Sequence, residues 1–91
     1  MTEKINLKSP VTLSPNTNFT IEFDIQKDGY TALGIVGFST YNRDSSPSIN
    51  ISGIELGSTS GKCYIQGRNS HQTNNAIIPM SAYVSILYIK K

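Results

Sequence analysis

The stretch FTIEFDIQ, residues 19–26, decides the fold class of this chain. Every odd-numbered residue in it is apolar, and every even-numbered residue is polar or charged. Successive side chains of a β-strand point to opposite faces, so the segment predicts a strand with one core face and one solvated face. Antiparallel sheets allow one face to meet water, and the pattern therefore favours an antiparallel sheet.

The amino-acid composition extends this conclusion to the whole chain. The 91 residues include 12 Ile, 12 Ser, 8 Thr and 8 Asn, against only 3 Ala, 5 Leu and 3 Glu. β-Branched residues favour strands, Ser and Asn favour turns, and the strong helix formers are scarce. We therefore expect one all-β domain over residues 1–91, an antiparallel, jelly-roll-like β-sandwich of seven or eight strands.

Turn signals divide the chain into further strands. The Lys-Asp-Gly sequence at 27–29 predicts a hairpin turn in which Gly29 has a positive φ. The next run, 30–38, is largely continuous in its apolar character, which predicts a strand covered on both faces, with its two glycines marking a bulge or a close backbone approach. The strand at 49–56 changes phase at Ser52-Gly53, where an extra residue fits a β-bulge.

The segment 76–89 predicts the final strand, and both of its faces are apolar. One face is an uninterrupted apolar stripe. The other carries Tyr83, Leu87 and Ile89 towards its end, which a solvated face should not do. We therefore predict these three residues to be an oligomer interface covered by a neighbouring subunit. A second layer of the same subunit is the alternative.

Catalytic and metal chemistry is not recognisable in the sequence, and we expect a non-enzymatic protein without a cofactor. His71 is the only histidine and Cys63 the only cysteine, whereas a zinc site needs three or four ligands. Cys63 lies in a strand-like run and is expected to be a small buried hydrophobe. Glu22 and Asp24 share a strand face, but that face is predicted to be wet, which argues against a glycosidase pair.

Charge and hydropathy exclude two classes of partner. Charged residues make up only 15% of the chain, the net charge is +2, and no basic stripe is present, so we expect no nucleic-acid binding. The apolar runs are too short to span a bilayer, and no apolar segment of the kind found in secretory signals follows Met1. We therefore expect synthesis in the cytoplasm and no membrane partner.

Two polar loops hold the candidate ligand-binding residues. These are Tyr41, Asn42, Arg43 and Asp44 in the first loop, and Arg68, Asn69, His71 and Gln72 in or beside the second. Aromatic faces with amide and guanidinium donors suit sugar recognition, because rings stack on sugars and planar groups bond their hydroxyls. Ordinary turn chemistry is the alternative explanation for the same residues.

The order of several segments also resembles a known family. The segments are TLSPNTNFTI at 12–21, DGYTALGIVGF at 28–38, IQGRN at 65–69 and VSILYIK at 84–90. Together they are similar to the small β-sandwich domains that end bacteriophage tail-fibre and minor structural proteins. The motifs are mainly structural, and no ligand residues come with the resemblance.

The resemblance implies a homotrimeric head or tip domain in the virion, next to other virion proteins and in contact with host-surface polysaccharide. We therefore expect a structural and receptor-binding module of a phage tail. One alternative is a purely structural decoration of a capsid or fibre. A small polysaccharide hydrolase is the other, and it would need carboxylates clustered in a cleft.

Overall fold

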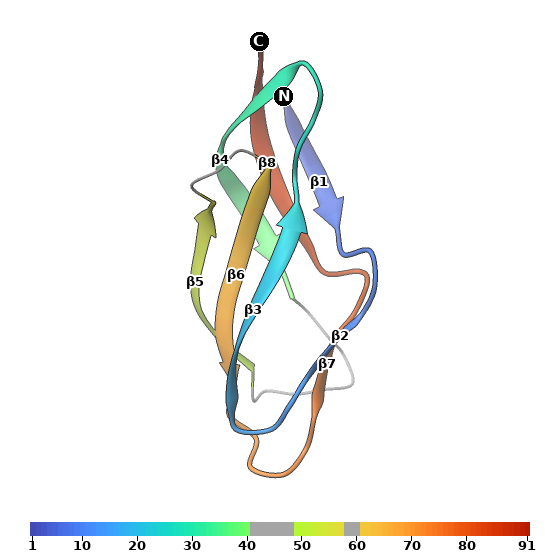
Figure 1. Ribbon diagram of the computed structural model, residues 1–91, viewed down its shortest axis with the longest axis vertical. Helices are drawn as coiled ribbons and strands as arrows, with labels where there is room; N and C mark the ends of the chain where they lie inside the picture. Colours follow the sequence, from blue (N-terminus) through green and yellow to red (C-terminus); the bar gives the residue numbers. More distant parts are fainter. Residues whose placement is uncertain (41–48, 58–60) are drawn as a thin grey trace.

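The alternating segments of the sequence form the strands of an antiparallel β-sandwich in the computed structural model, which describes residues 1–40, 49–57 and 61–91 (Figure 1). The described residues form eight strands and no helix. The strands are β1 (Thr2–Asn6), β2 (Val11–Leu13), β3 (Thr17–Asp24), β4 (Tyr30–Ser39), β5 (Ile49–Leu56), β6 (Lys62–Asn69), β7 (Ala76–Ile78) and β8 (Tyr83–Lys90). The predicted fold class and strand number are confirmed.

Two three-stranded sheets make up the layers of the sandwich. We call them the β8 sheet, with the order β1-β8-β4, and the β6 sheet, with the order β3-β6-β5, after their central strands. The short β2–β7 ribbon continues the molecule at one end (Figure 1). The first and last strands pair with each other, and β3, β4 and β5 alternate between the sheets. This connectivity is jelly-roll-like.

The apolar side chains of β3 pack into the space between the two sheets. Ile21 lies opposite Ile65 of β6, Phe23 lies opposite Cys63, and all four side chains are buried. From the facing sheet, β8 contributes the buried side chains of Val84, Ile86 and Tyr88. Burial of each large side chain stabilises the fold by about 1.5–3 kcal/mol, so this layer is the main source of stability.

The turn at 27–29 forms, but it does not close a hairpin. Gly29 has a φ of +80°, as predicted, and the Tyr30 N–H donates to the Lys27 carbonyl at 3.1 Å. The flanking strands β3 and β4 lie in different sheets, so the turn carries the chain from one layer to the other. The hairpin prediction was wrong because turn chemistry fixes the local chain reversal and not the sheet that the next strand joins.

Bulges occur where the glycines indicated them. The register of β5 against β6 shifts at Ser52, which confirms the predicted bulge. The register of β4 against β8 shifts twice, and the extra residues are Leu33 and Val36. The prediction that β4 is covered on both faces is not met within the single chain, because both side chains are exposed.

The segment 76–89 is two strands and not one. β7 pairs with β2, whereas β8 pairs with β1 and β4. Between them the Ala82 N–H donates to the Pro79 carbonyl at 3.0 Å and closes a turn. Proline has no N–H to donate to a ladder, so its presence marks the break. Met80, which the sequence placed on the apolar stripe, lies exposed in this turn.

Candidate functional site

The outer side of the β8 sheet carries an exposed apolar surface. In β8, Leu87 is 37% exposed and Ile89 is 53% exposed, although the residues between and before them face the core. In β4, the bulge residues Leu33 and Val36 are 55% and 57% exposed. We call these four residues the apolar face. The sequence predicted its β8 half, and the apolar run at 30–38 was the signal for the β4 half.

Glycines flatten the surface beside these side chains. Gly34 lies opposite Leu87, and Gly37 lies opposite Ser85. A Cβ added at Gly34 would meet no atom within 4 Å, so the space above this position is open. The apolar face is therefore a low strip along β4 and β8 that is exposed in the structure.

Tyr83 lies at the margin of this strip and is partly covered by its own chain. The Nζ of Lys4, on the neighbouring strand β1, lies 4.2 Å from the centroid of the Tyr83 ring. A cation at this distance over an aromatic face is attracted by the ring quadrupole. Thr2 and Asn6 continue the polar β1 side of the sheet. The predicted interface residues thus share one side of the sheet, and Tyr83 marks where it becomes polar.

The outer side of the β6 sheet is polar, in contrast to the apolar face. Its side chains bond one another across the strands: Lys62 Nζ lies 3.1 Å from Glu22 Oε1, and Gln66 donates to Glu55 Oε1 at 3.1 Å. The hydrogen bond to Glu22 raises the pKa of Lys62. Charged and amide groups on this side remain hydrated, so the surface is stable in water without a cover.

Arg68 lies near the C-terminal end of β6 and forms hydrogen bonds with the β2–β3 turn and with β3. Its guanidinium donates to Asn18 Oδ1 at 3.1 Å and to the Asn16 carbonyl at 3.2 Å, and it also contacts Asn16 Oδ1. Asn16 has a φ of +55°, a left-handed conformation that asparagine tolerates better than most residues. The planar guanidinium therefore holds the β2–β3 turn against β6.

Asn69 is fully buried and serves the fold. Its Nδ2 lies 3.2 Å from each of three carbonyl oxygens, those of Leu13, Ser14 and Asn74, and its Oδ1 accepts from the His71 N–H at 3.2 Å. The amide thus links the β2–β3 turn to the loop at 70–75. A side chain in this position is not accessible to a ligand, so we leave Asn69 out of the functional proposal.

The His71 ring holds the same loop together through hydrogen bonds to two backbone N–H groups. Its Nδ1 accepts from the Thr73 N–H at 3.2 Å and from the Asn74 N–H at 3.0 Å. Gln72 is exposed beside it. The structure thus brings Arg68, His71 and Gln72 to one end of the sandwich. The other predicted loop residues, Tyr41, Asn42, Arg43 and Asp44, lie outside the described residues.

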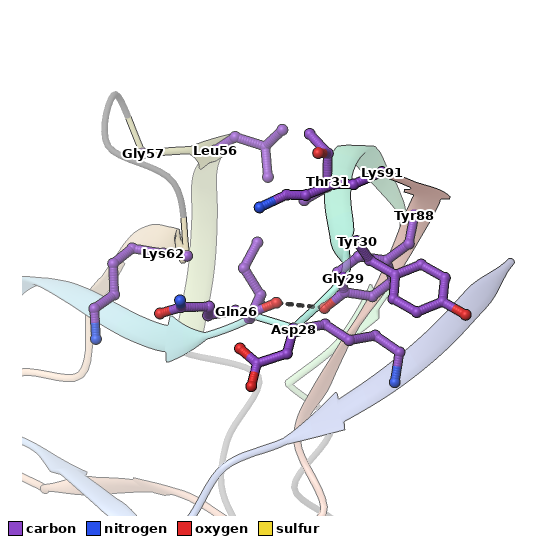
Figure 2. A pocket seen from close by; sticks show the side chains of 14 residues that line it. Gln26, Asp28, Gly29, Tyr30, Thr31, Leu56, Gly57, Lys62, Tyr88 and Lys91 are labelled. Carbon is purple, nitrogen blue, oxygen red and sulfur yellow. Dashed lines mark hydrogen bonds between the residues drawn. The ribbon is translucent and has the colours of Figure 1, made fainter.

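A pocket that the sequence did not predict opens between the sheets where β3 passes into β4 (Figure 2). Its volume is about 240 Å³. Ile25, Leu56 and Tyr88 contribute apolar atoms to its lining. The Tyr88 hydroxyl donates to the Ile25 carbonyl at 2.5 Å, and this bond bridges the two sheets (Figure 2). Burial raises the pKa of Tyr88.

Polar side chains from the segment at 26–31 and from the distant Lys91 surround this pocket. Gln26 and Asp28 come from the β3–β4 connection, Thr31 from β4, and Lys91 from the residue after β8. Figure 2 shows the Lys91 side chain reaching between Thr31 and Leu56. We call this site the end pocket. No local sequence pattern could have found it, because only the sandwich brings the segment at 26–31 next to Leu56, Tyr88 and Lys91.

The charges of the end pocket are partly neutralised by the fold. Lys27 and Lys62 also line it, but Lys27 Nζ lies 3.3 Å from Glu3 Oε2, and Lys62 is bound to Glu22. Within the described ranges, no ion pair engages Lys91 or Asp28. The pocket therefore offers one ammonium group and one carboxylate group to a ligand.

Across residues 1–40, 49–57 and 61–91, no three His, Cys, Asp or Glu side chains gather in a way that could hold a metal ion. Cys63 is buried, as predicted, and its burial raises the pKa of the thiol. The described part of the chain also has no helix of the length and hydropathy needed to cross a membrane.

Comparisons with family models, curated proteins and solved structures find no match to this chain.

Proposed function

We propose that this protein is a non-enzymatic module that assembles with copies of itself through the apolar face. One observation carries the proposal: four aliphatic side chains on one side of the β8 sheet are 37–57% exposed, while the corresponding side of the β6 sheet is polar. Full burial of such a side chain is worth about 1.5–3 kcal/mol, so covering the exposed half of each contributes about 1 kcal/mol. A domain of this size has a small core, and assembly adds to it.

The resemblance to phage tail-fibre domains suggests the setting of this assembly. In that setting the protein is a homotrimer in the virion, with the β8 sheets of three copies around the symmetry axis and other virion proteins beyond the domain. The polar ends of the sandwich then face outward and contact host-surface glycans. Three copies of a weak site raise the overall affinity, because the second and third contacts are intramolecular.

Side-chain labelling by hydroxyl radicals tests the assembly. Ile89 and Ile77 form a matched pair, since both are isoleucines and are 53% and 47% exposed in the single chain. We expect Ile89 to be protected at working concentration and Ile77, in β7, to be labelled. Equal labelling of the two at all concentrations would contradict self-association through the apolar face.

A purely structural role is the second candidate, and a specific observation favours it. Arg68 and Asn69 use their polar groups within the fold, so the loop at this end of β6 has fewer groups free for a ligand than the sequence indicated. An array of host cell-wall polysaccharides separates the two roles. Binding supports the receptor-binding module, and a negative result across the array supports the structural role.

A further inference from the structure

The end pocket lies at the opposite end of β6 from Arg68, and it differs from that region in having side chains available to a ligand. Lys62, at the start of β6, lines the pocket, and Arg68 lies near the end of the strand. Gln26, Asp28 and Thr31 are exposed around the opening. The site therefore has the two parts that small-molecule pockets share, an apolar interior and a few polar groups that fix orientation.

The size of the pocket limits the ligand. Its volume of about 240 Å³ is below the range of about 300–1,000 Å³ that is usual for pockets that hold drug-sized molecules. A nucleotide or a peptide segment would extend well beyond it. One saturated ring with its substituents is the scale that fits.

The polar groups of the pocket determine the chemistry of that ring. The Lys91 ammonium only donates hydrogen bonds, the Asp28 carboxylate only accepts them, and the Gln26 amide and Thr31 hydroxyl do both. A purely apolar ligand would bury these groups without partners, at a cost of about 1–3 kcal/mol each. Several hydroxyls on one ring, each a donor and an acceptor, match the mixture.

The charge of the pocket favours an uncharged ligand. Lys27 and Lys62 are paired with Glu3 and Glu22, and the two remaining charges, on Lys91 and Asp28, have opposite signs. A phosphate or a carboxylate would gain one ammonium partner and meet one carboxylate. A neutral polyhydroxylated ring meets no such conflict.

We propose that the end pocket binds one neutral sugar residue of a glycan. The C–H surface of the ring lies against the apolar side that includes Leu56, and its hydroxyls bond Gln26, Asp28 and Thr31. This inference rests on the proposed glycan-binding function and assigns it to the end pocket in preference to the loop at 70–75.

Backbone amide chemical shifts of the full chain, recorded while neutral hexoses and N-acetylhexosamines are added, test this site. We expect the shifts to change at residues 26–32 and 56–57 and at the end of β8. The Gln26→Ala variant should bind at least tenfold more weakly. Thr12→Ala, which removes an exposed polar side chain of β2 away from both the end pocket and the loop at 70–75, should bind as the unmodified protein does.

Three outcomes would overturn the proposal, and they are distinguishable. Unchanged affinity in Gln26→Ala would show that the sugar does not bind in the end pocket. Shifts centred on residues 70–75 and lost in Gln72→Ala leave the glycan-binding function in place but move it to the other end. No shift with any sugar, together with no binding on a polysaccharide array, contradicts the glycan-binding function as well. The dispersion of the same spectra shows whether each variant is folded.

Discussion

Leu87 of β8 lies directly opposite Gly34 of β4, so an exposed aliphatic side chain stands beside a residue that has no side chain. The next residue along β8, Tyr88, is only 2% exposed on the other side of the same strand. The β8 sheet therefore carries apolar side chains on both sides, and those on the outer side of β4 and β8 are exposed. This relationship is the basis for the proposed self-association.

A charge at Leu87 should dissociate the assembly without unfolding the chain. In Leu87→Asp, the carboxylate would be buried at the interface without a partner, which costs several kcal/mol. In the single chain the position is 37% exposed, so the carboxylate stays hydrated there. We expect the mass in solution to fall to that of one chain while the circular dichroism spectrum is retained.

Thr20→Asp is the control for this variant. It introduces the same charge into a strand, on the exposed polar side of the β6 sheet. Its mass should equal that of the unmodified protein. If both variants dissociate, charge in general and not the apolar face controls the association.

An alanine substitution should lower the stability of the fold at Gly67 but leave it nearly unchanged at Gly34. A Cβ at Gly67 would overlap the Asn50 carbonyl oxygen and lie 2.7 Å from Phe19 Cζ, whereas a Cβ at Gly34 meets nothing within 4 Å. We expect Gly67→Ala to lower the free energy of unfolding by about 1–3 kcal/mol or more, as overpacking does. Gly34→Ala should leave it within about 0.5 kcal/mol, the usual range for surface positions. Urea denaturation at a concentration where the chain is a monomer measures both, and equal losses would contradict the register of β6 between β3 and β5.

Asn69→Ala should destabilise the fold because it leaves three carbonyl groups without the Asn69 donor, and the bond to one of them, from Leu13, is buried. The substitution removes the amide that reaches the Leu13, Ser14 and Asn74 carbonyls, and each buried group left without a partner costs about 1–3 kcal/mol. Asn75→Ala, at an exposed position in the same loop, is the matched control and should change stability little. A small effect in Asn69→Ala, measured by urea denaturation, would show that the amide is not a structural link.

Tyr88→Phe should show a pH-dependent effect. Burial raises the pKa of Tyr88 above its ordinary value of 10.0, so the folded state favours the protonated hydroxyl. The stability from this group is fully present below pH 10 and is lost as the pH rises through the folded-state pKa. The difference in unfolding free energy between the unmodified protein and Tyr88→Phe should therefore be largest near neutral pH and shrink above pH 10. A difference that stays constant across this range would mean that the hydroxyl is not buried against Ile25.

The sequence predicts the layers of this fold better than their connections. The alternation around Phe23, the bulge at Ser52 and the positive φ of Gly29 depend on local periodicity or turn chemistry, and all three are found in the structure. The hairpin at 27–29 and the single strand at 76–89 failed because each depends on which sheet a strand joins. Sheet membership is set by packing of residues far apart in the chain.

The residues of the candidate sites also divide into those that local periodicity predicts and those whose surroundings depend on the tertiary fold. The exposure of Leu87 and Ile89 follows from their phase in β8, which the sequence shows. The burial of Asn69 does not follow from sequence, since asparagine is equally common in exposed turns. The end pocket could not be predicted, because Gln26, Leu56 and Lys91 meet only when both sheets are in place.

The mass of the unmodified protein in solution decides whether the chain self-associates. Light scattering of the eluting peak, over a range of concentrations, should give three times the 10.0 kDa mass of one chain. A mass of 10.0 kDa at every concentration would contradict the account, because the apolar face would then be exposed to water in the native protein.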